Sequence, residues 1–147
     1  MPTKHQILGL TGEIRVVKGC ACPRCKRLKT LRRLPPNFKC ADVICDFCGF
    51  LAQVKSVTTS NLTKIPATVL GAAWSVQKER MDAGIYFLLY LVLISGRKSA
   101  IYYLSADVQK PEMFQPRKPL SAKARRAGWQ GFLYLLKNVE AAFVRVC

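Results

Sequence analysis

Two pairs of cysteines have the spacing of a metal site built from four thiolates. Cys22 and Cys25 form one Cys-x-x-Cys pair, and Cys45 and Cys48 form the other. Two intervening residues allow one tight turn to direct both sulfur atoms at the same ion, and four thiolates bind zinc tetrahedrally. The nineteen residues between the pairs fit the range of zinc ribbons. Because four protein ligands leave no open position on the ion, we expect this zinc to be structural.

The alternatives are free core cysteines and a redox-active Cys-x-x-Cys pair, and the presence of two pairs argues against both. The chain has seven cysteines, so three remain: Cys20, Cys40 and Cys147. Cys20 and Cys40 are expected in the core, with a role as alternative ligands as the second interpretation, and Cys147 is expected to be inert. An odd count suits metal-bound thiolates in a reducing compartment better than disulfides.

An acidic residue and a Gln-x-Lys triplet surround the second cysteine pair. Ten residues separate Asp42 from Gln53, and Lys55 follows two positions later. Residues two apart on a strand point to the same face, so Gln53 and Lys55 would share one. The Asp42 carboxylate and the Gln53 amide oxygen are ligands that Mg²⁺ accepts, and the Lys55 ammonium could stabilise charge on a phosphate. The pattern predicts a magnesium-dependent phosphodiesterase site.

The same three residues also fit an ordinary exposed turn followed by a solvated strand, and spacing alone leaves the two interpretations evenly balanced. Context favours the site. The chain has only eight acidic residues, and Asp42 is one of them, beside a hairpin that a metal would brace.

The charge of the chain predicts a polyanionic partner. There are 24 Lys and Arg residues against 8 Asp and Glu, a formal net charge of +16. Nucleic acid is the polyanion that this excess favours, as DNA or, alternatively, as the RNA of a ribonucleoprotein. A membrane surface is disfavoured because no long amphipathic basic helix is visible. The 147 residues, half of them hydrophobic, suffice for one domain over 1–147.

A basic segment lies near the C-terminal end. Its cations are Arg117, Lys118, Lys123, Arg125 and Arg126. Ser121 is expected to cap a short helix, whose first N–H groups would add to the phosphate-binding capacity of the cations. Trp129 has two interpretations, as a base-stacking residue and as a core residue. The segment is predicted to bind DNA, and Arg125 and Arg126 most directly.

Hydrophobic periodicity predicts the elements that position these residues. They are a short helix or turn over 3–18 that leads into a strand at 14–17, a strand from 38 or 42 that turns at the second cysteine pair, a returning strand over 50–57, a helix over 67–82, strands over 85–94 and 100–104, a loop over 107–121, and a final helix or strand over 132–146. This order favours an α/β fold with a mixed central sheet. The apolar run 84–94 is too short to span a bilayer as a helix, which takes about 20 residues, and no secretory signal is visible. The protein is therefore expected to be soluble, cytoplasmic and without a membrane partner.

Four motifs resemble those of a known enzyme family. They are Cys22-Pro-x-Cys25, Ala41-Asp42-x-x-Cys45-x-x-Cys48, Lys55-Ser56 and Arg117-Lys-Pro-Leu-x-x-x-Ala-Arg-Arg-Ala-Gly-Trp129-x-Gly131. They resemble the catalytic domain of the DpnI-like methyl-directed restriction endonucleases, which belong to the PD-(D/E)XK nuclease superfamily. The matches run from about Glu13 to Gly131, and the last block is the most specific.

The resemblance implies a PD-(D/E)XK core with an inserted zinc site and Mg²⁺-dependent cleavage of double-stranded DNA. It places the catalytic acid at Asp42, the catalytic lysine at Lys55 and a metal-ligand position at Gln53. Glu13 falls where the family has an acid before the first cysteine pair. The family cuts DNA that contains N6-methyladenine in a GATC context, so a similar target in a prokaryotic or phage setting is expected.

The chain departs from the family pattern in two respects. Gln53 stands where the family has glutamate, which removes one negative charge and should weaken metal binding. A catalytically inactive DNA-binding module is therefore the alternative function. The family also has a C-terminal winged-helix domain, which this chain is expected to lack because the sequence stops at residue 147. The expectation is weaker or less specific binding, or a second DNA-reading element supplied by a homodimer or a partner subunit.

Overall fold

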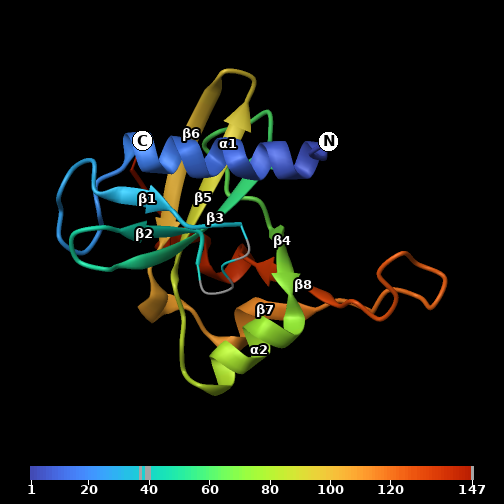
Figure 1. Cartoon of the computed structure of the whole chain (residues 1–147). Coiled ribbons are helices and arrows are strands. Elements are labelled where there is room, and N and C mark those ends of the chain that lie inside the picture. The colour runs from blue at the N-terminus through green and yellow to red at the C-terminus, as the bar shows by residue number, and fades with distance from the viewer. Residues whose placement is uncertain (37, 39–40, 147) are drawn as a thin grey trace. The chain divides into compact units, whose positions relative to one another are not determined.

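The computed structural model describes residues 1–36, 38 and 41–146. The described chain forms two β-sheets and two α-helices. The helices are α1 (Lys4–Gly19) and α2 (Trp74–Asp82), with 3₁₀ turns η1 (Ala106–Val108), η2 (Pro111–Met113) and η3 (Lys137–Ala142). The strands are β1 (Leu31–Arg33), β2 (Val43–Cys45), β3 (Leu51–Thr58), β4 (Thr68–Ala73), β5 (Leu88–Ser95), β6 (Lys98–Leu104), β7 (Phe114–Pro116), β8 (Gly131–Leu135) and β9 (Val144–Arg145) (Figure 1).

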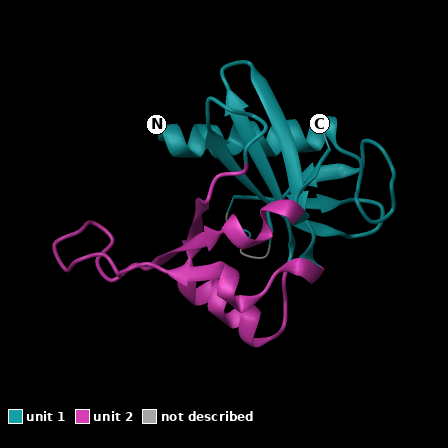
Figure 2. Cartoon of the chain, turned by 180° about the vertical axis from the view of Figure 1, so that it is seen from behind, with its two compact units in different colours: residues 1–64, 87–106, 142–147 teal, residues 65–86, 107–141 magenta. Residues whose placement is uncertain are grey.

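The chain divides into two compact units (Figure 2). Unit 1 consists of residues 1–64, 87–106 and 142–147, and unit 2 of residues 65–86 and 107–141. In the described part of the chain, no helix has the length and apolar character that crossing a membrane requires.

The sheet of unit 1 is mixed, as the sequence predicts. Its strand order is β1-β2-β3-β5-β6-β9. Strands β3 and β5 are parallel, from Ala52 opposite Leu88 to Thr58 opposite Ile94, whereas the other neighbours are antiparallel. Every residue of β5 except the last is buried, which is the pattern of a strand covered on both faces. The predicted α/β class with a mixed central sheet is confirmed.

Helix α1 packs on the sheet of unit 1 (Figure 1). A capping box begins it: the Thr3 side chain accepts the Gln6 N–H at 3.2 Å, and the Gln6 side chain accepts the Thr3 N–H at 2.8 Å. The strand predicted at 14–17 is wrong, because these residues lie within α1. Over four residues, apolar positions fit a helical and a strand period equally well, and burial of Val16 against the sheet decides in favour of the helix.

Gly12 allows α1 to approach β3 closely. A Cβ atom there would overlap the Ser56 hydroxyl, whereas one at Gly9 would meet nothing within 4 Å. We expect Gly12→Ala to lower the free energy of unfolding by about 1–3 kcal/mol, because an added methyl group overpacks the contact. Gly9→Ala is the matched control and should raise it by roughly 0.5–1 kcal/mol through helix propensity. Urea denaturation measures both, and equal stabilisation by the two would show that α1 does not depend on this contact.

Unit 2 has a three-stranded antiparallel sheet in the order β4-β8-β7. Phe114, Phe132 and Tyr134 form an aromatic cluster on it, with ring centroids 5.0–5.8 Å apart. Gly71 provides the space for the Phe132 ring, which a Cβ atom would overlap. The helix predicted over 67–82 is half wrong: its first part is strand β4, and its second part is α2. Strand β4 exists because it pairs with β8, which begins at Gly131, far from Thr68–Ala73 in the chain, so local periodicity could not reveal it.

Candidate active site and metal centre

The four cysteines predicted to bind zinc come together in unit 1. Cys22 and Cys25 lie between α1 and β1, Cys45 ends β2, and Cys48 lies in the turn before β3. Their four sulfur atoms lie within 4.8 Å of one another. The Cys22–Cys48 and Cys25–Cys45 pairs are separated by 3.6 and 3.7 Å, close to the roughly 3.8 Å between sulfurs of a tetrahedral zinc site with bonds of about 2.3 Å. The cluster can therefore bind a metal ion such as zinc.

Both cysteine turns have the same backbone geometry. The Cys22 carbonyl accepts the N–H of Lys26, and the Cys45 carbonyl accepts the N–H of Gly49, each at 2.9 Å. Lys26 and Gly49 both have positive φ angles, of 65° and 77°. A lysine in this left-handed conformation costs about 1–2 kcal/mol, whereas glycine adopts it freely. The repeated turn directs the two sulfurs of each pair toward a common point.

Hydrogen bonds and burial act oppositely on two of the thiols. Burial disfavours the charged form of Cys45, but the hydrogen bonds that its sulfur forms with the Thr30 hydroxyl and with the Cys48 N–H lower its pKa to about 6. Burial raises the pKa of Cys22 to about 12. Metal ligation requires thiolates, so Cys45 is prepared for it by its neighbours, while Cys22 depends on the positive charge of the ion. Cys20 is buried in the core as predicted, and Cys40 and Cys147 lie outside the described residues.

Asp42 is fixed against the strand that carries Gln53 and Lys55. Its N–H donates to the Ala52 carbonyl at 3.0 Å, and its Oδ2 accepts the N–H of Val54 at 2.8 Å. Ala52 and Val54 are buried, whereas Gln53 and Lys55 are half-buried. The alternation places Gln53 and Lys55 on one face of β3, as predicted from their spacing.

Glu13 reaches the same site from α1. Its carboxylate pairs with the Arg33 guanidinium of β1 at 3.3 Å, and its side chain is about one-fifth exposed. Burial raises the pKa of Glu13, the negative charge of Asp42 raises it further, and the charges of Arg33 and Lys55 oppose the shift. These interactions place Glu13, Asp42 and Lys55 in one neighbourhood. Spacing could not identify Glu13, because the contact depends on how α1 packs on the sheet.

The approach of two carboxylates is notable because acids are scarce in unit 1. Its residue ranges contain three, Glu13, Asp42 and Asp46. Asp46 is exposed and pairs with Arg32 at 3.1 Å, while the negative charge of Asp42 lies close enough to raise the pKa of Glu13. A divalent cation would reverse this repulsion. The two carboxylates and the Gln53 amide offer oxygen donors of the kind that Mg²⁺ accepts.

The raised pKa of Glu13 leads to a prediction about stability. The native protein holds this proton more tightly than the unfolded chain, so stability should fall as pH rises from the ordinary glutamate range through the raised native pKa. Glu13→Gln removes the titrating group, and with it this fall in the free energy of unfolding. The variant should therefore be more stable than the wild type at neutral pH. Urea denaturation from pH 4 to 8, without Mg²⁺ or chelator, measures the difference.

Added Mg²⁺ provides the control for this measurement. A cation that binds the native state stabilises it, so millimolar Mg²⁺ should stabilise the wild type more than Glu13→Gln. A difference between the two proteins that stays constant over the whole pH range would show that Glu13 titrates normally.

The predicted DNA-binding residues lie in unit 2, on the loop between β7 and β8. We call residues 117–130 the basic finger (Figure 1). Its base is closed by hydrogen bonds from the Arg117 N–H to the Gly131 carbonyl at 2.9 Å, and from the Gln130 amide to the Arg117 carbonyl at 2.7 Å. The finger has five cations and no acidic residue. All five are exposed: Arg117, Lys118, Lys123, Arg125 and Arg126.

The tip of the basic finger differs from the prediction. Residues 122–128 form turns, so the helix expected after Ser121 is wrong. The Leu120 N–H donates to the Trp129 carbonyl at 2.8 Å, and the Gly128 N–H donates to the Leu120 carbonyl at 2.9 Å. These cross-loop bonds continue the β7–β8 hairpin, which competes with a helix. Phosphate contacts here would depend on side-chain cations and turn N–H groups.

Trp129 lies between the two interpretations offered for it. The residue is half-buried, and the Arg126 guanidinium lies 4.5 Å from its ring centroid. The indole also lies close to Gly131, where an added Cβ atom would meet the ring. The ring therefore supports the finger and holds Arg126 at the surface.

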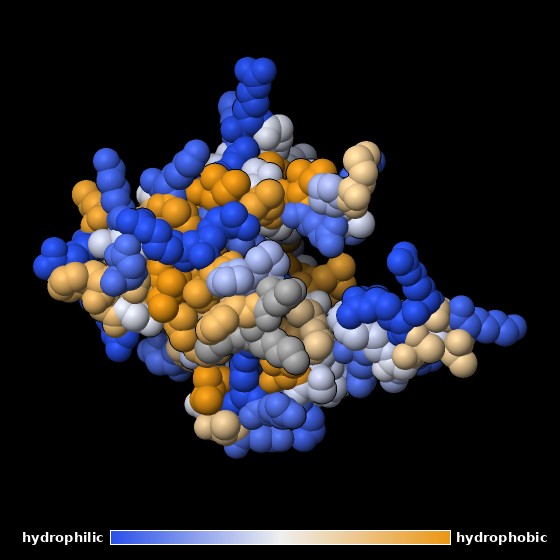
Figure 3. Space-filling view, viewed as in Figure 1, coloured by the Kyte–Doolittle hydropathy of each residue, from blue (hydrophilic) through white to orange (hydrophobic). Residues whose placement is uncertain are grey.

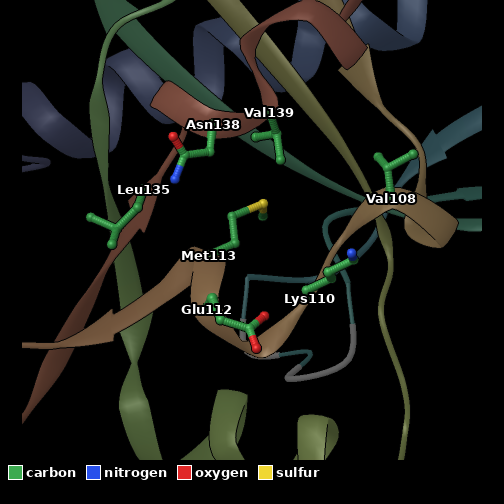
Figure 4. Close-up of a pocket in the computed structure, with 7 residues that line it drawn as sticks. All are labelled: Val108, Lys110, Glu112, Met113, Leu135, Asn138 and Val139. Atoms are coloured by element: carbon green, nitrogen blue, oxygen red, sulfur yellow. The ribbon is translucent and has the colours of Figure 1, made fainter.

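Unit 2 also contains a pocket of about 280 Å³ (Figure 4). Its lining is Val108, Lys110, Glu112, Met113, Leu135, Asn138 and Val139. None of the predicted site residues lines it, so the candidate chemistry of the described chain does not involve this pocket.

A known family matches nearly the whole chain. The model of the Dam-replacing family, DpnI, matches residues 2–146, which include the cysteine cluster, the carboxylate site and the basic finger. A comparison with curated proteins gave no match. Membership of this family implies DNA binding and a restriction-endonuclease-like enzyme. The chain belongs to the DpnI, or Dam-replacing, family.

Proposed function

We propose that this protein is a Mg²⁺-dependent endonuclease that cleaves double-stranded DNA with a PD-(D/E)XK type of core. The observation that carries the proposal is the approach of Glu13 and Asp42 to each other and to Lys55, in a unit with only three acidic residues in its ranges. Placing two carboxylates close together is unfavourable without a compensating charge, and the binding of a cation would explain why the fold does so. Family membership supplies DNA as the substrate class.

Each residue of the site has a proposed role. Glu13, Asp42 and Gln53 would hold the Mg²⁺, which when bound stabilises charge on the phosphate and activates water. Lys55 donates hydrogen bonds to a phosphate oxygen or to the attacking water and stabilises the charge that develops. Asp42 needs no rearrangement, because the Val54 N–H already fixes its carboxylate. Zinc at the four cysteines has a structural role in this proposal, since four thiolates leave no open position.

The proposed target is duplex DNA with N6-methyladenine in GATC-type sites. Membership of a methyl-directed restriction-like family supports this choice, and we place the activity inside a prokaryotic or phage-infected cell. The basic finger, with its five exposed cations, would hold the DNA backbone. A homodimer or a partner subunit is the proposed source of a second contact.

One experiment tests the proposal most directly. Purified protein with Mg²⁺ is incubated with plasmid from adenine-methylating and from non-methylating hosts. Cleavage confined to the methylated plasmid supports both parts of the proposal, and cleavage of both supports a nuclease without methyl specificity. Intact plasmids at high protein concentration would exclude the nuclease.

Gln53 favours a second candidate function, DNA binding without cleavage. A neutral amide at this position supplies less negative charge for a divalent cation than glutamate would. This function predicts salt-sensitive duplex binding by an inactive wild type. Gln53→Glu should then produce Mg²⁺-dependent cleavage, and a variant that stays inactive despite binding Mg²⁺ would show that the defect lies elsewhere.

A further inference from the structure

The loop formed by the first cysteine pair and the residues after it contains a concentration of exposed cations. Arg24, Lys26, Arg27 and Lys29 are all exposed. Asp46, in the second cysteine turn, pairs with Arg32, 3.1 Å away. Within the described residues none of these four cations forms an ion pair, so the loop presents positive charge that the proposed catalytic residues and the basic finger do not use.

Two of these cations stand where the backbone disfavours a lysine. Lys26 and Lys29, with φ angles of 65° and 60°, are the residues other than glycine that have positive φ in the described part of the chain. Lys26 occupies the position that Gly49 has in the matching cysteine turn. Glycine would be easier to fold at both sites, so the presence of lysine points to a use for the side chain.

Apolar groups lie beside these cations. The Arg27 guanidinium stacks over the Phe47 ring at 3.8 Å, and Phe47 is 59% exposed. Leu28, between the cations, is 75% exposed. We call residues 24–29 with Phe47 the zinc-lobe face. Figure 3 shows hydrophilic and apolar side chains next to one another at this end of the molecule, on the left.

We propose that the zinc-lobe face is a second DNA-contact surface, which binds backbone phosphates of the duplex that flank the phosphate at the active site. Lysine and arginine at this density match a polyanion, and an exposed aromatic ring under an arginine suits contact with a sugar or base edge. The proposal rests on the DNA substrate of the proposed function, but not on cleavage.

The position of the face fits this role. Asp42 and Cys45 lie three residues apart along the strand that connects them, a distance of about 10 Å. Successive nucleotides of one DNA strand rise by about 3.4 Å. A duplex that runs along this strand from a phosphate at Asp42 would bring phosphates a few nucleotides away to the zinc-lobe face.

The test replaces two lysines by glycine, which adopts the left-handed backbone conformation of these positions more easily. Lys26→Gly and Lys29→Gly together remove two charges and relieve two left-handed lysines, so the variant should melt at the same or a higher temperature and keep its zinc. Binding to a 25-base-pair duplex is measured over a range of salt concentrations, in an Asp42→Asn background that prevents cleavage. We expect the slope of log K against log salt to fall by about 2, and the affinity at moderate salt to fall by about tenfold.

The control removes the same charge elsewhere in unit 1. Arg97 and Lys98 are exposed at the β5–β6 turn, beyond the Thr58–Ile94 end of the parallel pair. The cysteine turn lies at the other end, where β3 begins. Arg97→Ala with Lys98→Ala should leave the slope within about half a unit of the unsubstituted chain.

Three results would overturn the proposal. An unchanged slope in the double-glycine variant excludes phosphate contacts at the zinc-lobe face. Equal losses in the control pair assign the effect to net charge. Tighter binding to structured RNA than to duplex DNA, lost in the double-glycine variant, assigns the face to RNA. Failure of the proposed function gives a different result. If the wild type binds duplex DNA with the expected slope but does not cut it, the proposed endonuclease activity is refuted, whereas the DNA-contact surface is still supported.

Discussion

Asp42→Asn should abolish DNA cleavage while the protein stays folded and still binds duplex DNA. The carboxylate is held by the Val54 N–H at 2.8 Å, and an asparagine oxygen can accept the same hydrogen bond. The substitution therefore removes the charge and keeps the shape. Because that charge would hold the cation and stabilise the transition state, we expect cleavage to fall by about 10³-fold or more. Time courses of plasmid nicking in Mg²⁺ measure the loss.

Asp46→Asn is the matched control for this prediction. Asp46 lies on the same hairpin, but it is exposed and its partner is Arg32 at the surface. Surface ion pairs of this kind contribute about 0–1 kcal/mol, so both stability and cleavage should stay close to wild type. If Asp46→Asn lost as much activity as Asp42→Asn, the loss would reflect the charge or folding of the hairpin as a whole.

Cys45→Ser should have the largest effect on stability. The Cys45 sulfur lies at the end of β2, 3.7 Å from that of Cys25, so a metal ion there connects the β2–β3 hairpin to the segment before β1. Structural zinc contributes about 10–16 kcal/mol in zinc-finger peptides, which is comparable to the whole stability of a domain. We expect Cys45→Ser to bind zinc weakly and to lose about 5 kcal/mol or more of unfolding free energy. Metal analysis and thermal unfolding by circular dichroism measure the two effects.

Cys20→Ala separates the loss of a metal ligand from the loss of a buried cysteine. Cys20 is 7% exposed in the same core, but its sulfur is not part of the four-cysteine cluster. Its replacement should leave the zinc content unchanged. A Cys45→Ser protein that kept one zinc per chain and the melting temperature of Cys20→Ala would contradict a structural zinc at these four residues.

The parts of the site that local chemistry determines could be predicted from the sequence. The two cysteine turns are short, and each directs its own pair of sulfurs, so spacing alone predicted the cluster. The positions of Gln53 and Lys55 on one face follow from the strand period. The hydrogen bond that fixes Asp42 to the same strand is a consequence of hairpin geometry that the cysteine turn makes possible.

The parts that depend on distant segments could not be predicted. Glu13 joins the site because Gly12 lets α1 lie against β3, and no local pattern encodes that approach. The sequence predicts a helix over strand β4 because its small apolar residues fit both the helical period and the strand period. Pairing with β8 favours the strand. The turns after Ser121 follow from pairing across the basic finger, which outweighs a capping signal.

The order in which the strands are synthesised has a consequence for the finished enzyme. The strand that carries Gln53 and Lys55 takes its parallel partner from β5, which begins 36 residues after Ala52. Between them the chain makes residues 65–86 of unit 2, and unit 2 is completed by residues 107–141. A nascent chain on the ribosome therefore presents both proposed catalytic residues on an unpaired edge until β5 has been made. A nuclease built in this way would acquire its cutting site late in synthesis, and fragments that end before Leu88 should be harmless to the DNA of the cell that makes them.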